Sequence, residues 1–193
     1  GVDAIDHAED RERFGELQAR LAMDGGIDAA VDVADPRQAL AAVIVLDHIT
    51  KFMATWKLEY GVLVPLLPVL DLTLLHNKGA AFSFLSDAGG WQRWFFTTVA
   101  LGVSAWIALW LNRLPREKRW LSASLALILG GAVGNLIDRV IQGYVVDFIF
   151  VHWGDSYFPA FNVADSAITV GAIMMMVDVL FLDREDRHAD QAG

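Results

Sequence analysis

A pair of aspartates, Asp147 and Asp165, stands between two apolar runs that are each long enough to cross a bilayer. Ionisable groups are costly within hydrocarbon, so those found near it tend to be functional, paired or in contact with water. Two carboxyl groups that share a site do not both ionise easily, so one keeps a proton while the other stays charged. That state can activate a water molecule and protonate the leaving group of an amide. The pair therefore predicts an aspartic peptidase, and the alternative is two separately solvated loop aspartates.

Amide and guanidinium side chains occupy positions from which they could support such a pair. Asn162 and Asp165 are three residues apart, so both can point from one helix into one site, and Asn162 can also cap that helix. Asn135 and Arg139 are four residues apart at the end of an apolar segment. Asn77 stands at the tip of an expected strand. These residue types and positions fit supporting roles around the two carboxyl groups.

Other hydrolytic mechanisms find no support in the residue patterns. The sequence contains no HExxH zinc motif, no Ser-x-x-Lys pair and no G-x-S-x-G motif. It also contains no Cys, which excludes thiol nucleophiles, disulfides and Cys-based metal sites. The five His are scattered along the chain. The sequence therefore predicts neither a metal site nor another cofactor.

The composition is that of a membrane protein. Hydrophobic residues make up 55% of the 193 residues, and the mean hydropathy is +0.40, which is high for a soluble chain. The net charge of −9 lies mostly in the tails, since residues 1–37 hold ten acidic residues and four Arg, and residues 183–193 hold four acidic residues and two Arg. Without a basic stripe to neutralise phosphates, we expect no binding of nucleic acid. The acidic, polar beginning also differs from a cleavable signal peptide, so none is expected.

Four apolar segments are long enough to be membrane-spanning helices: residues 39–56, 94–111, 120–137 and 160–182. A helix of about 18–20 residues, at ~1.5 Å per residue, spans ~30 Å of hydrocarbon. In the third segment Ala126, Gly130 and Gly134 form a stripe of small residues, which allows close helix packing. The first segment contains Asp47 and Lys51, which share a helix face. They are either a purely structural ion pair or a support for the site.

The residue pattern over 62–85 predicts a small β element rather than a membrane helix. Pro65 and Pro68 break any helix, and the residues that follow alternate in the period of a strand over 70–77. The Asn77-Lys78-Gly79 sequence indicates a turn. We expect this element to lie on the membrane surface.

The loop over residues 112–119 sets the expected orientation, because it is the most basic loop in the chain. The positive-inside rule places it in the cytoplasm. Four crossings then place both termini in the cytoplasm, and the β element, residues 138–159 and the active site at the outer face. We divide the chain into an acidic extension (1–36), expected to be cytoplasmic, a four-helix membrane peptidase domain (37–184) and a cytoplasmic tail (185–193).

Five sequence blocks occur in order around the apolar segments: DHITK (47–51), HNKGAAF (76–82), GGAVGNLIDR (130–139), VVDF (145–148) and FNVADSAI (161–168). In order and spacing they resemble the blocks of bacterial lipoprotein signal peptidase, also called signal peptidase II, over about residues 37–182. The resemblance implies an aspartic endopeptidase of the cytoplasmic (inner) membrane. Such an enzyme removes signal peptides from prolipoproteins by cutting just before the diacylglyceryl-modified Cys. It also implies a mainly α fold, which is a four-helix bundle with an extracytoplasmic β-cradle. The partners that it implies for the protein are lipidated substrates and membrane lipid.

Carried over block by block, the resemblance implies roles for nine residues. The catalytic dyad would be Asp147 and Asp165. The residues that line the site or bind substrate would be Asn77, Asn135, Arg139 and Asn162. The supporting polar residues would be Asp138, Asp47 and Lys51. Two departures from the family are His48, where Gln is usual, and the acidic extension, since the family normally starts close to its first membrane segment.

Two other classes of protein compete with the peptidase. In a small transporter or channel subunit, a polar path would be lined by Asp47, Lys51, Asp138 and Asp165. A transport site is expected near the membrane midplane, whereas Asp147 and Asp165 are expected near one face. A non-catalytic membrane scaffold built on the stripe of small residues would leave the converging Asp and Asn residues without a purpose.

Overall fold

The fold of the chain is given by a computed structural model, which describes residues 35–78, 91–154 and 156–182. Within these ranges four helices are long and apolar enough to cross a membrane. They are α2 (Pro36–Lys57), α3 (Trp91–Arg113), α4 (Arg119–Ile141) and α5 (Val163–Val177), and α5 continues into a short π-helical turn, η2 (Asp178–Leu182). The prediction of four apolar helices and a small sheet is confirmed. The acidic extension up to residue 34 and the tail from 183 lie outside the described residues.

The helix boundaries follow from local capping chemistry. Asp35 caps α2, because its side chain accepts a hydrogen bond from the Arg37 backbone N–H at 2.9 Å, and Pro36 occupies the first turn. The last helix begins at Val163, three residues later than the apolar run at 160, because Asn162 takes the cap position. Helix α4 continues to Ile141, so it carries residues 138–141, which the sequence analysis had assigned to the outer connection.

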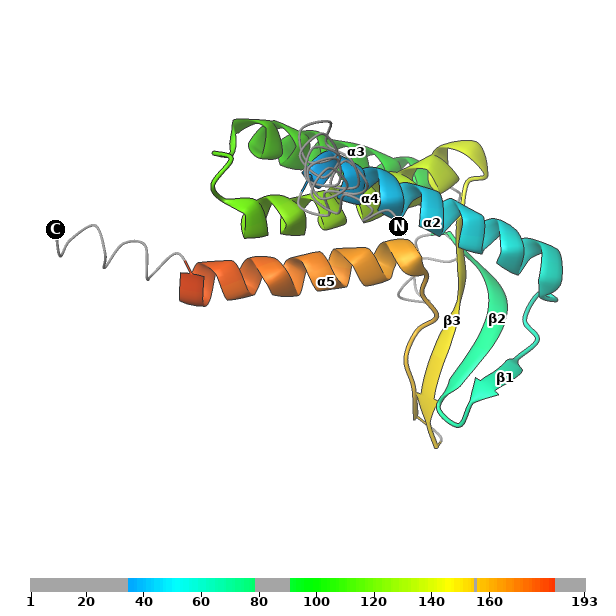
Figure 1. The fold of residues 1–193 in the computed structure, drawn as a ribbon. Helices are drawn as coiled ribbons and strands as arrows, with labels where there is room; N and C mark the ends of the chain where they lie inside the picture. Colours follow the sequence, from blue (N-terminus) through cyan, green and yellow to red (C-terminus); the bar gives the residue numbers. More distant parts are fainter. Residues whose placement is uncertain (1–34, 79–90, 155, 183–193) are drawn as a thin grey trace, which may run out of the picture. The chain divides into compact units, whose positions relative to one another are not determined.

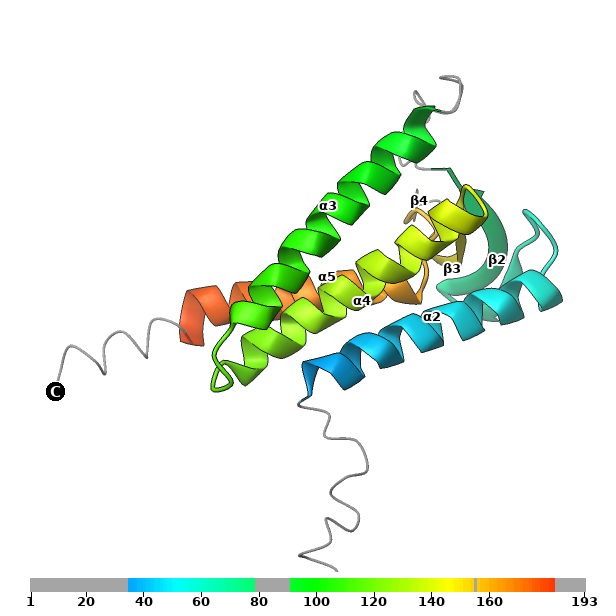
Figure 2. The same ribbon diagram turned by 90° about the horizontal axis from the view of Figure 1, so that it is seen from above.

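Helix α4 is the central helix, since it packs against α2, α3 and α5 (Figures 1 and 2). Glycines allow these close approaches. A Cβ atom on Gly130 would lie 2.9 Å from the Val43 Cβ of α2, and one on Gly131 would lie 2.3 Å from the Ala164 carbonyl oxygen of α5. The stripe of small residues therefore does allow close packing, as predicted. Gly131 adds a second contact surface, toward α5, that the four-residue spacing did not reveal.

One end of the bundle is apolar and carries the basic loop. The buried cluster of Ile107, Leu125 and Leu129 packs against Leu40 at the start of α2 and Leu114 after α3. Near the far end of α5, the Trp120 indole N–H donates to the Met174 carbonyl at 2.8 Å. The beginning of α2, the α3–α4 connection and the end of α5 therefore share this end.

The sheet lies at the opposite end of the helices (Figures 1 and 2). Its antiparallel strands follow the order β1 (Val64–Leu67), β2 (Leu70–Asn77), β3 (Val145–Trp153) and β4 (Ser156–Tyr157). Strands β1 and β2 fall within the predicted element at 62–85, whose part from residue 79 lies outside the described residues. Strand β3 was not predicted, and Asp147 lies on this strand rather than in a loop.

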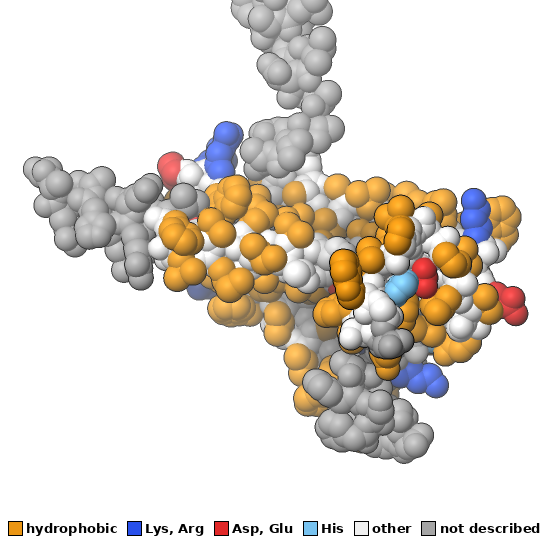
Figure 3. All heavy atoms as spheres, turned by 90° about the horizontal axis from the view of Figure 1, so that it is seen from below, with side chains coloured by type: hydrophobic (Ala, Val, Ile, Leu, Met, Phe, Trp, Pro, Cys, Tyr) orange, Lys and Arg blue, Asp and Glu red, His pale blue; other side chains and the backbone are white. Residues whose placement is uncertain are grey.

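Hydrophobic side chains cover much of the outer surface of the helices. Figure 3 shows them over one face of the molecule. Phe52 of α2 is 72% exposed and Trp106 of α3 is 61% exposed. Large apolar side chains that face outward in such numbers on long helices are expected to contact lipid rather than water.

Candidate active site

The two candidate aspartates come from different elements and meet where the sheet joins the helices. Asp147 lies on β3 and is 2% exposed, and Asp165 lies in the first turn of α5. The other polar residues expected at the site come from three places: Asn77 from the end of β2, Asn135 and Arg139 from the last turns of α4, and Asn162 from the α5 cap. The structure therefore brings together side chains separated by up to 88 residues in sequence.

Asn162 joins the two aspartates. Its side-chain Nδ2 donates to Asp147 Oδ1 at 2.8 Å, while its Oδ1 accepts the Asp165 backbone N–H at 2.9 Å. The Asn162 backbone N–H donates in turn to Asp165 Oδ2 at 3.3 Å, which completes a reciprocal capping box. One fully buried amide thus sets the helix start and aligns both carboxyl groups.

Each carboxyl group also accepts a second amide donor. Asn77 Nδ2 donates to Asp147 Oδ2 at 3.0 Å, because the β2–β3 register pairs Asn77 with Val145. Asn135 Nδ2 donates to Asp165 Oδ1 at 2.8 Å. Both aspartates are therefore held in fixed orientations by neutral donors.

The environment of Asp147 changes its acidity. The pKa of Asp147 is raised to about 7. Burial is the main cause and the charge of Asp165 adds to it, while the hydrogen bonds from Asn77 and Asn162 and the charge of Lys51 act in the opposite direction. A carboxyl group with this pKa holds a proton part of the time at neutral pH. The pair can therefore present one acid and one base in the same site.

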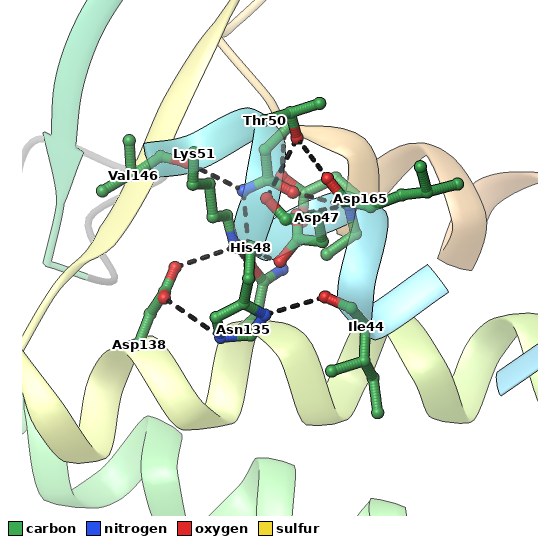
Figure 4. A network of polar contacts seen from close by, with 12 residues as sticks. Ile44, Asp47, His48, Thr50, Lys51, Asn135, Asp138, Val146 and Asp165 are labelled. Atoms are coloured by element: carbon green, nitrogen blue, oxygen red, sulfur yellow. Dashed lines mark hydrogen bonds and ion pairs between the residues drawn. The ribbon is translucent and has the colours of Figure 1, made fainter. Parts of the chain in front are cut away.

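A cation and a deeper ion cluster adjoin the pair. Arg139 donates from Nη1 to the Asn135 carbonyl at 3.3 Å, and its charge acts on Asp165 and Asp147. Behind Asn135 lies the Lys51 ammonium, 4% exposed, which donates to Asn135 Oδ1 at 2.9 Å (Figure 4). The site is thus connected to a charged group in the interior of the bundle.

Lys51 binds two carboxylates as well as Asn135. Its Nζ lies 2.6 Å from Asp47 Oδ2 and 2.8 Å from Asp138 Oδ2. Asp47 is fully buried, and its other oxygen accepts the Ala164 backbone N–H of α5 at 2.9 Å. The ion pair therefore ties α2 to α4 and to the first turn of α5. This geometry favours support of the site over an isolated structural pair.

Two contacts of this network were not found from the sequence. The contact of Asp47 with the Ala164 backbone N–H could not be read from residue types, because the donor belongs to the backbone. The glycine at position 134 is the sequence feature that could have indicated a close approach of Asp47, since a Cβ atom on Gly134 would lie 2.8 Å from Asp47 Oδ2. His48, noted only as a departure from the family, lies with Nε2 3.9 Å from Asp138 Oδ1. Within the described ranges, no three His, Asp or Glu side chains are grouped as around a metal ion.

Comparisons with known proteins agree on one family. The family model described as signal peptidase (SPase) II matches residues 39–181. A lipoprotein signal peptidase of Acinetobacter baumannii (strain ATCC 17978) is 58% identical over 142 residues, which cover 74% of this chain and 81% of that protein. One from Pseudomonas fluorescens (strain Pf0-1) is 54% identical over 139 residues, or 71% and 82% of the two chains. A bacterial membrane enzyme solved by the in meso method at 1.9 Å resolution aligns with a TM-score of 0.69 and 28% identity, over 78% of this chain and 95% of that one.

Proposed function

The chain belongs to the signal peptidase II family and is a protease that acts on prolipoproteins, and we propose that Asp147 and Asp165 are its catalytic dyad. The observation that carries this proposal is the position of Asn162, which binds both carboxyl groups and holds them in one buried site. Six other residues complete our assignment as substrate-binding or supporting groups: Asn77, Asn135, Arg139, Asp138, Asp47 and Lys51.

The proposed reaction divides acid and base work between the two carboxyl groups. Asp147 holds the resting proton, because burial raises its pKa to about 7. Asp165 is the carboxylate, since it accepts donors from Asn135 and from the Asn162 backbone beside the Arg139 guanidinium. Asp165 removes a proton from water, whose oxygen attacks the scissile carbonyl. Asp147 then protonates the departing amine, and the proton on Asp165 restores the pair to one shared proton.

We assign the site to the outer face of the bacterial inner membrane. The site lies at the sheet end of the helices, and the basic loop at 112–119 lies at the other end. The positive-inside rule places that loop in the cytoplasm, together with both termini. An exported substrate therefore meets the carboxyl groups at the boundary between lipid and water.

That position accounts for a lipidated substrate. A scissile bond just before a diacylglyceryl-modified Cys is held at the boundary by its acyl chains, each buried CH₂ contributing about 0.8 kcal/mol. We propose that residues 37–184 form the four-helix membrane peptidase domain, which the family match over 39–181 supports. The transporter hypothesis is not favoured, because the polar cluster lies at one end of the helices and the family is that of a peptidase.

The test is cleavage of a diacylated prolipoprotein by purified protein, followed as a mobility shift. Asp147→Asn and Asp165→Asn should each abolish turnover while binding of the lipidated substrate persists. The double variant should be no worse than either single one, because residues that act as a unit are not additive. Asp71→Asn, at another buried aspartate of the same sheet, is the matched control and should retain turnover.

Two outcomes would contradict parts of the proposal. Substantial turnover by either dyad variant, at equal protein, would remove that residue from the mechanism. Equal turnover of an unlipidated precursor would reject the requirement for the diacylglyceryl group while leaving the dyad untouched.

A further inference from the structure

A pocket of about 430 Å³ lies between α2 and α4 beside the buried ion cluster, and the proposed reaction does not use it. Its lining is formed by His48, Lys51, Phe52, Thr55, Asp138, Gln142 and Val146. The lining combines buried charge with apolar side chains at the rim. Such a combination is typical of a site that holds one polar group of a larger, mainly apolar molecule.

One polar atom of the pocket, His48 Nε2, is an acceptor without a donor. His48 Nδ1 contacts the Ile44 carbonyl oxygen at 2.9 Å, so Nδ1 carries the hydrogen and the neutral ring presents Nε2 as an acceptor (Figure 4). Nε2 is buried without a hydrogen-bond partner and lies 3.9 Å from Asp138 Oδ1, beyond hydrogen-bond distance. Two acceptors that face each other across this gap can both be satisfied by one group that carries several N–H donors.

The charge of the pocket favours a cation. Asp47 and Asp138 both contact Lys51, so these three side chains together have a net charge of −1, and the Arg139 guanidinium, whose charge also acts on Asp138, lies on the side of the dyad. Asp138 is 2% exposed, and its Oδ2 is occupied by the Lys51 ammonium at 2.8 Å, while its Oδ1 faces His48 Nε2 at 3.9 Å. Buried acceptors and uncompensated charge are costly, so a ligand that supplies both donors and positive charge is stabilised there.

The position of the pocket along the helices places it at the level of the lipid headgroups. Its residues lie in the second half of α2 and at the end of α4, which is the end of the bundle where the sheet begins. Phe52 at the rim is exposed, and Trp56 one turn further along α2 is 75% exposed. An exposed Trp near the end of a spanning helix, here Trp56, marks the level of the headgroups.

We propose that this pocket binds the primary ammonium group of a phosphatidylethanolamine headgroup. Three N–H donors on one cation bridge His48 Nε2 and the Asp138 carboxylate. The Gln142 side-chain amide, exposed at the end of α4, donates to the lipid phosphate. The acyl chains then lie along the exposed face of α2 at Phe52. The site shares Lys51 and Asp138 with the groups that support the proposed active site, but it contains neither carboxyl group of the dyad and does not depend on their catalytic roles.

The decisive experiment is a series of lipids that differ only in headgroup methylation. Binding to the purified full chain in detergent is measured by native mass spectrometry at pH 8, where histidine side chains are ordinarily neutral. Phosphatidylethanolamine, its N,N-dimethyl derivative and phosphatidylcholine keep one positive charge and identical acyl chains while N–H donors are removed. We expect affinity to fall along the series, with at least about a tenfold difference between its ends, since hydrogen bonds to charged groups are worth that much. Equal affinity across the series would overturn the proposal, and this comparison needs no variant.

Variants assign the donor preference to the pocket. His48→Phe keeps a ring but removes the acceptor, and should reduce the preference for phosphatidylethanolamine about tenfold. His48→Gln restores an acceptor and should recover the preference. His152→Phe is the matched control, because it makes the same substitution on β3, outside the pocket. An unchanged preference in His48→Phe, or an equal loss in His152→Phe, would reject the pocket as the binding site.

A soluble headgroup separates a lipid ligand from a free amine. Glycerophosphoethanolamine carries the same ammonium and phosphate but no acyl chains. It should fail to displace phosphatidylethanolamine when both are present at the same concentration. Displacement at equal concentration would reject a membrane lipid as the ligand.

Discussion

Replacement of the buried acid Asp147 by Asn should stabilise the folded protein, and the gain should grow with pH. Burial raises the pKa of the Asp147 carboxyl group from 3.8 to about 7. Because the folded-state pKa lies above the unfolded one, the favourable contribution of the protonated acid is complete below pH ~4 and is lost as the pH rises through 7. Asp147→Asn removes this loss. Three pKa units correspond to about 4 kcal/mol above pH 7, as an upper bound.

Hydrogen bonding adds a second effect that does not depend on pH. Asp147 accepts from Asn77 and from Asn162 through its two oxygens, whereas an Asn in its place offers one oxygen and one N–H group. The new side-chain amide group would then face one of the two amide donors, from Asn77 or Asn162, without an acceptor between them. This costs about 1–3 kcal/mol of folding stability unless the Asn77 amide rotates by half a turn. The diagnostic quantity is thus the slope of the stability difference with pH and not its value at one pH.

The assay is thermal unfolding of wild-type and variant proteins in detergent between pH 4 and pH 8.5. The difference in Tm, variant minus wild type, should rise by on the order of 10 °C from pH 4 to pH 7 and then level off. Glu59→Gln removes an exposed carboxylate and should show no such slope. Asp165→Asn removes the like charge beside Asp147, so the pKa of Asp147 should fall. The loss of stability with rising pH should then be smaller than in the wild type and should level off at a lower pH. A difference that is constant or falls between pH 5 and pH 8 would refute the reasoning.

Three further outcomes follow from the geometry. Gly131→Ala should destabilise the bundle by about 1–3 kcal/mol in chemical unfolding, because its Cβ would lie 2.3 Å from the Ala164 carbonyl oxygen, while Gly102→Ala, with open space around it, should be tolerated. Lys51→Met should cost about 3–5 kcal/mol, since it leaves two buried carboxylates without a cation; a variant with wild-type Tm would show that the cluster carries no such cost. Turnover against pH should be bell-shaped, with the alkaline decline near pH 7 where Asp147 loses its proton; a flat profile from pH 6 to pH 9 would contradict the assigned acid.

Features set by local chemistry could be predicted from the sequence. The start of α2 follows from Asp35 and Pro36, and the four spanning helices follow from apolar runs of sufficient length. Strand β3 could not be predicted in this way, because VVDFIFVHW is almost continuously apolar and lacks the alternation of a strand with one wet face. Its pairing with β2, distant in the sequence, decides the structure.

In the candidate site too, local contacts could be predicted from the sequence and contacts between distant segments could not. Asn162 could be recognised as a cap from its spacing to Asp165, since the capping box is local. Its bond to Asp147 depends on where β3 docks, and the contact of Asp47 with the Ala164 N–H depends on how closely α2 and α5 approach. Neither approach is encoded within a window of neighbouring residues. The roles assigned to the nine residues, catalytic for the two aspartates and supporting for the other seven, remain predictions for the cleavage assay.

The capping box at Asn162 and Asp165 also has a consequence for biosynthesis. The same amide that starts the final helix delivers the second carboxyl group and binds the first, so helix initiation and assembly of the dyad are one event. A nascent chain that has exposed Asp147 but not yet inserted its last segment carries a single, unaligned acid. With Asp147 and Asp165 as the proposed catalytic pair, the order in which the residues leave the ribosome delays activity until the last helix is in place.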